Sequence, residues 1–116
     1  MVNDKFEKFE SEIMEHIIAE DPAISHILEN QYKSAKITNR DFTGRGFFTK
    51  FEVCDKSLKL LDNPNCILGI TQAKMEGLKY GVGFILFVKD GLISTLECYT
   101  YDEPWSGEVT SYIFYK

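Results

Sequence analysis

The spacing of the apolar residues changes once along this chain, near Ser34, and that change restricts the fold more than any other feature. Before Ser34, apolar side chains recur every three or four residues, which is the spacing of an amphipathic helix. After Ser34 they alternate with polar ones, and aromatic and β-branched residues become frequent, as is typical of strands. We therefore expect an α+β domain in which two N-terminal helices pack on an antiparallel meander sheet of five or six strands.

The first helix is expected to begin at Asp4, which is followed by Glu7 at the spacing of a capping box. Asp21 and Pro22 have the residue types of an N-cap and a first helical position, so they predict a second helix that fades near Lys33. The outer face of the first helix is expected to be acidic and to carry Glu7, Glu10, Glu12 and Glu15.

Strands are expected over residues 36–42, 47–53 and 66–75, and then in the runs VGFILFVK, LISTLECYTY and EVTSYIFYK. Asp90 and Gly91 predict a tight hairpin between the first two of these runs, because both residue types tolerate positive φ. VGFILFVK is apolar on both faces, so we expect a central strand that is covered on both sides. The last strand is expected to pair with the strand before it.

The composition indicates a single domain, residues 1–116, with a formal net charge of −5. This acidity disfavours contact with nucleic acid or anionic lipid, and it speeds encounter with a basic partner if the acidic residues cluster. Three widely spaced cysteines predict neither a disulfide framework nor a zinc site. The charged start MVNDKFEKFE is unlike a signal peptide, and we expect a cytoplasmic chain with no cofactor, no metal and no membrane span.

Sequence motifs for catalysis are absent: the chain has no G-x-S-x-G, P-loop, H-E-x-x-H or complete dinucleotide fingerprint. Arg40 and Arg45, the only arginines, flank a turn beside Asp41. They form either an anion site at this corner or a solvated turn with a local ion pair, and the second interpretation is favoured.

Glu97 stands in an otherwise apolar and aromatic strand, so it draws attention as a titratable group. One interpretation places it near Glu76, Asp102 and Glu103 in a carboxylate pair with acid–base capacity. The favoured one places it on the solvent face together with Tyr99 and Tyr101.

Trp105 lies in the loop DEPWSG, close in sequence to several tyrosines. It either plugs one end of the core, which is the favoured interpretation, or anchors a partner with Asp102 and Glu103 on an acidic rim.

The run GVGFILFVKDGLISTLECYTYDEPW and the earlier RDFTGRGFFTKFEV resemble a set of small bacterial proteins of uncharacterised function. The resemblance covers about two-thirds of the chain and implies a bacterial, cytoplasmic, single-domain protein. It implies no activity and no functional residues.

Our leading hypothesis is a non-enzymatic, protein-binding module that uses an exposed sheet or loop edge, in the way of small acidic immunity proteins. The alternative is a small-ligand or enzymatic site in a pocket between the helices and the sheet. Homodimerisation through the last strand, YIFYK, is a further possibility, because that strand offers an apolar edge.

Overall fold

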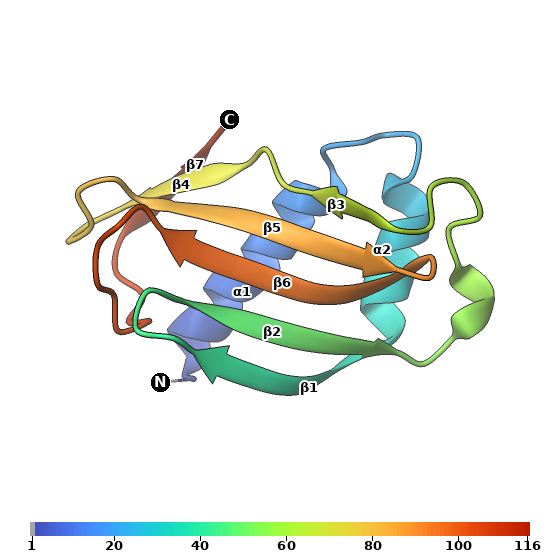
Figure 1. Ribbon diagram of the computed structural model, residues 1–116, viewed down its shortest axis with the longest axis horizontal. Coiled ribbons are helices and arrows are strands. Elements are labelled where there is room, and N and C mark those ends of the chain that lie inside the picture. Colours follow the sequence, from blue (N-terminus) through green and yellow to red (C-terminus); the bar gives the residue numbers. More distant parts are fainter. Residues whose placement is uncertain (1) are drawn as a thin grey trace.

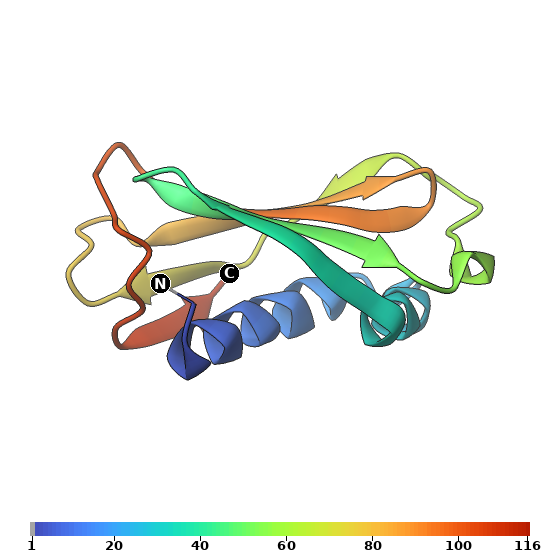
Figure 2. The same cartoon turned by 90° about the horizontal axis from the view of Figure 1, so that it is seen from below.

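The computed structural model describes residues 2–116, which form one sheet with a layer of two helices on one of its faces (Figures 1 and 2). This confirms the expected α+β class. The helices are α1 (Asp4–Ile18) and α2 (Ser25–Ser34), with a short 3-10 turn η1 (Lys56–Leu58). The strands are β1 (Ala35–Phe42), β2 (Gly46–Val53), β3 (Cys66–Leu68), β4 (Gln72–Met75), β5 (Val82–Lys89), β6 (Leu92–Thr100) and β7 (Tyr112–Tyr115).

The first helix begins at Asp4, but its N-cap is Asn3, and the second helix begins later than expected. The side chain of Asn3 caps α1 by accepting a 2.9 Å hydrogen bond from the backbone N–H of Phe6, so Asp4 already lies inside the helix. The side chain of Asp21 does accept a hydrogen bond from the backbone N–H of Ala23, but this bond closes a separate turn before the helix. The second helix begins only at Ser25, because residues 22–24 complete that turn first.

The sheet is antiparallel throughout, but its strand order, β1-β2-β6-β5-β4-β7, is not the order of a meander. β6 lies between β2 and β5, so both of its edges are already paired. The last strand cannot join it there, and the expected pairing of the last two strands is wrong. Instead, β7 pairs with β4 at the far edge of the sheet.

The predicted strand at residues 66–75 is divided into β3 and β4, which pair with opposite halves of β5. The hairpin between β5 and β6 is confirmed, with positive φ at Asp90 and Gly91. Helices cover only one face of β5, as Figure 2 shows, so the expectation of cover on both faces is wrong.

The core lies between the helices and this covered face. It contains the apolar stripe of α1 and the inward side chains of the central strands, among them Phe9, Ile13, Phe47, Phe84, Leu86 and Leu96. Several aromatic rings meet there, such as Phe6 and Phe47 with centroids 4.8 Å apart. Burial of this apolar surface is the main driving force for holding the helices on the sheet.

One buried amide joins α2 to the far end of the sheet. Gln31 is completely buried, and its Nε2 donates to the carbonyls of Leu58 and Gly91, both at 2.8 Å. Its Oε1 accepts the N–H of Ile93 at 2.9 Å. A single side chain therefore satisfies backbone groups from η1, from the β5–β6 turn and from the start of β6.

Replacing this amide should destabilise the domain strongly. Gln31→Leu keeps similar bulk but leaves buried N–H and C=O groups without partners, so we expect a loss of about 3 kcal/mol in the free energy of unfolding. His26→Gln, at an exposed position of the same helix, should change it by less than about 0.5 kcal/mol. Urea unfolding measures both, and equal stabilities would contradict this role for Gln31.

Candidate functional site

The sheet face that turns away from the helices has no helix over it (Figure 2). Cross-strand register places Phe48, Glu97 and Ile85 side by side on it, since Phe48 pairs with Glu97 and Glu97 with Ile85. All three side chains are half-buried. We call this surface the open face; its residues are Asp41, Phe48, Lys50, Glu52, Ile67, Gln72, Ile85, Phe87, Thr95, Glu97, Tyr99, Tyr101 and Tyr115.

Glu97 lies at the centre of the open face, with an aromatic ring on one side and a branched aliphatic chain on the other. Within residues 2–116 its carboxylate has neither an ion pair nor a hydrogen bond. A carboxylate on such a surface stays hydrated while the face is exposed. If a partner covered the face, the charge would need a cation or hydrogen-bond donors, because an unpaired buried charge is costly.

Tyrosines form one end of the open face. The rings of Tyr99 and Tyr101 meet edge to face with centroids 5.5 Å apart. They lie over Gly83, where an added Cβ would come within 2.6 Å of both hydroxyls. Glycine at this position lets the two rings lie close to the sheet.

Gln72 links two tyrosines at this end of the open face through hydrogen bonds. Its Oε1 accepts the hydroxyl of Tyr101 at 2.8 Å and that of Tyr115 at 3.3 Å. Burial, with the neighbouring Tyr99 adding to it, raises the pKa of Tyr101 to about 12. The Tyr101 hydroxyl therefore remains a hydrogen-bond donor over the whole physiological range.

Because the pKa of Tyr101 is raised in the folded chain, the free energy of unfolding should fall at alkaline pH. In the unfolded chain Tyr101 ionises near its ordinary pKa of 10.0, whereas in the folded chain it ionises near 12, so stability is lost as pH rises between these values. Tyr101→Phe should lose less stability than the native chain between about pH 9 and pH 11.5 in urea unfolding. Tyr80→Phe, at an exposed tyrosine, is the control; an identical loss in native chain and Tyr101→Phe would contradict this account.

At the opposite end the open face is hollowed. A depression of about 530 Å³ is lined by Ile67, Phe87, Thr95 and neighbouring side chains. Ile67 is 64% exposed at its rim. The open face thus combines a shallow apolar hollow, a central carboxylate and a hydroxyl-rich end.

Of the residues singled out from sequence, Glu97, Tyr99 and Tyr101 lie together on the open face, as the favoured interpretation of Glu97 expects. The other carboxylates are not brought to Glu97. Glu103 accepts the backbone N–H groups of Lys79 and Tyr80 at 3.0 and 2.9 Å. No carboxylate pair with acid–base capacity is formed by these residues.

Arg40 points to the opposite side, toward the helices. It makes a two-pronged ion pair with Glu10, at 2.7 Å from Nη2 to Oε1 and 3.1 Å from Nε to Oε2. Thr49 donates its hydroxyl to the same carboxylate. Glu10 is only 3% exposed, so the expectation that it belongs to the acidic outer face is wrong, and Arg40 pairs with it rather than with Asp41.

Removing the arginine should isolate a buried charge. Its hydrogen bonds to Glu10 raise the pKa of Arg40, in keeping with a close pair. Arg40→Ala should cost about 3 kcal/mol of unfolding free energy, since Glu10 would stay buried without a cation. Arg45→Ala, which removes an exposed ion pair, should cost less than about 1 kcal/mol. Denaturant unfolding compares the two, and similar losses would contradict the structural role of Arg40.

Arg45 and Asp102 form an exposed ion pair at 3.2 Å at one corner of the sheet. Close to this corner Trp105 is only 8% exposed; its indole N–H donates to the carbonyl of Glu108 at 2.9 Å, and its ring packs near Phe47. This burial agrees with the interpretation of Trp105 as a plug at one end of the core, and not with that of an exposed anchor for a partner.

Sequence reasoning did not single out Phe48, Ile67, Ile85 and Phe87 as site residues. Alternation along β2 predicts only that Phe48 shares a face with Lys50 and Glu52. The signal for Ile85 and Phe87 was the continuous apolar run of β5, which was interpreted as cover on both faces. Whether a helix covers an apolar strand face depends on the number of helices, and two short helices cover one face only.

Two of the three cysteines lie in the core or pack against it, and one histidine packs on an aromatic ring. Cys98 is buried, and burial raises the pKa of its thiol; Cys66 is half-buried and its pKa is raised for the same reason, while Cys54 is exposed. His16 stacks on Phe114 with centroids 4.3 Å apart. In the part of the chain from Val2 onward, no group of three or more potential metal ligands occurs.

None of the helices within residues 2–116 has the length and apolar character needed to cross a membrane. A scan against protein-family models finds no match to this chain, and searches of curated proteins and of solved structures find none either.

Proposed function

We propose that this chain is a non-enzymatic binding module whose open face docks on a partner protein that supplies a lysine or arginine side chain to Glu97. The observation that carries this proposal is the position of Glu97: a carboxylate without a cation, flanked across the strands by Phe48 and Ile85.

The surroundings of Glu97 support a protein partner. Interfaces are enriched in aromatic residues, and this face presents Phe48, Phe87 and three tyrosines. Tyrosines offer a large apolar area with a hydroxyl that can form hydrogen bonds across an interface. The hollow beside Ile67 can receive an apolar side chain of the partner.

Charge complementarity restricts the partner's chemistry. Covering the open face removes water from Glu97, and a cation of the partner restores the lost stabilisation. A partner that presents only apolar groups would leave the carboxylate buried and unpaired. The preferred partner surface therefore has one basic side chain surrounded by apolar ones, and inhibition of such a partner in a bacterial cytoplasm is the role we favour.

A phage-displayed library of random peptides, panned on the immobilised chain, tests this proposal. Selected peptides should carry a lysine or arginine flanked by apolar residues. Their affinity should fall by at least about thirtyfold for Glu97→Lys, because truncating or reversing one member of a desolvated charge pair costs 2–5 kcal/mol or more.

Glu7→Lys provides the matched control, since it makes the same charge change at an exposed position of α1, on the other side of the sheet. It should bind the selected peptides within about threefold of the native chain. Selection of peptides without a basic residue, or equal losses for both variants, would contradict the proposal. Thermal melting of each variant shows whether the fold is retained.

A further inference from the structure

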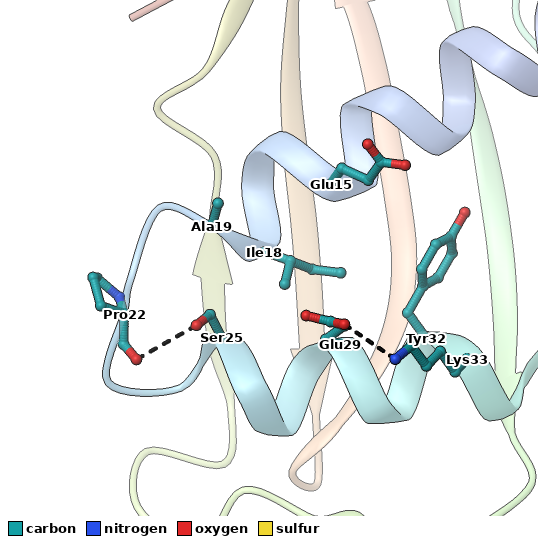
Figure 3. Close-up of a pocket in the computed structure, with 8 residues that line it drawn as sticks. All are labelled: Glu15, Ile18, Ala19, Pro22, Ser25, Glu29, Tyr32 and Lys33. Atoms are coloured by element: carbon teal, nitrogen blue, oxygen red, sulfur yellow. Dashed lines mark hydrogen bonds and ion pairs between the residues drawn. The ribbon is translucent and has the colours of Figure 1, made fainter.

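A groove separates the two helices on the side of the helical layer away from the sheet (Figure 3). It has a volume of about 540 Å³, which lies within the range of small-molecule pockets. The last turn of α1, the connection to α2 and one face of α2 line it. This groove shares no residue with the open face.

The bottom of the groove is apolar. Ile18 is 6% exposed and points into the space between the helices in Figure 3. Ala19 and Pro22 extend this apolar surface along the connection to α2. The half-buried ring of Tyr32 borders the other end, and its hydroxyl donates to Oγ of Ser11 at 3.4 Å. These side chains provide a surface for a compact apolar group.

The rim of the groove is acidic. Glu15 lines it from α1 and has no ion-pair partner within the described residues 2–116. Glu29 lines it from α2 and pairs at 3.1 Å with Lys33, both side chains being more than half exposed. The groove therefore carries one carboxylate in excess of its cations.

The helical part of the chain as a whole is also negatively charged. Eight acidic and three basic residues precede Ala35, so the helical part has a formal charge of −5, while the rest of the chain carries ten of each and is neutral. The whole net charge of the protein thus resides in the helical layer. Its field favours the approach of cations to the groove rather than of anions.

We propose that the inter-helix groove is a second binding site, independent of the open face, for a small amphiphilic cation: an amine joined to an apolar body. The ammonium group lies at the rim between Glu15 and Glu29. The apolar body lies on Ile18 and Pro22, and the ring of Tyr32 attracts the positive charge through its π-face.

Phenylbutylamine is a suitable probe because it pairs an ammonium group with an apolar ring, and phenylbutyrate is its control of opposite charge. In titrations followed by amide chemical shifts, the amine should shift signals of residues around Ile18 and Tyr32, and phenylbutyrate should not. Failure of the amine to bind, or equal affinities for both compounds, would overturn the proposal.

Two variants test the location. Ala19→Trp places a large side chain at an exposed position of the groove and should weaken amine binding at least tenfold. Glu15→Gln should weaken it about threefold, the size expected from one exposed ion pair. Glu7→Gln, with the same charge change near the other end of α1, should leave the affinity unchanged.

Native-like affinity in Ala19→Trp would overturn the assignment to the groove. Equal weakening by Glu15→Gln and Glu7→Gln would show attraction by net charge alone and would overturn it as well. Because Glu97 lies on the opposite side of the sheet, Glu97→Lys should leave amine binding intact, which separates this site from the open face.

Discussion

The structure depends on the burial of one helical stripe against one face of a twisted sheet. Phe9, Ile13 and Leu28 on the helices have almost no exposed surface. They share one core with side chains on the covered face of the sheet, among them Phe84 and Leu86. This apolar contact supplies the driving force, but it is not directional. Two polar contacts fix the position of the helices: the ion pair of Glu10 with Arg40, and the three hydrogen bonds of Gln31. Each would leave unsatisfied groups in the core if the helices shifted.

One-sided cover has a direct consequence for binding. The helical side of β5 buries four apolar side chains, those of Val82, Phe84, Leu86 and Val88, while Ile85 and Phe87 are half-buried on the other face. Large exposed apolar surfaces on a domain of this size commonly mark interaction sites. Here the surface also holds a carboxylate that pairs with no cation among residues 2–116, and the net negative charge lies on the opposite, helical side. The molecule therefore offers two chemically different surfaces, one with apolar and aromatic side chains around a central carboxylate, the other acidic and grooved.

Much of the secondary structure followed from local signals. The period change near Ser34 located the end of α2, and Asp90-Gly91 located the central hairpin. Features that depend on distant residues were missed. From the helix pattern alone, Glu10 is predicted to be solvated. It is buried because β1 brings Arg40, thirty positions later in the chain, into an ion pair with it. The place of β7 beside β4 follows from the occupied edges of β6, which no local pattern reveals. Glu97 and its two tyrosines were found because alternation alone decides their face, whereas the groove depends on the angle between two helices.

Hydroxyl-radical footprinting of the isolated chain, read by mass spectrometry, tests the central claim that one sheet face is covered and the other is open. The structure predicts strong labelling of Phe48, Ile67 and Phe87 and protection of Phe47, Phe84 and Leu86, which alternate with them on the same strands or on neighbouring ones. Protection of both sets in dilute solution would show that the open face is already covered, and it would contradict this account. Labelling of both sets would contradict the packing of the helices on the inner face.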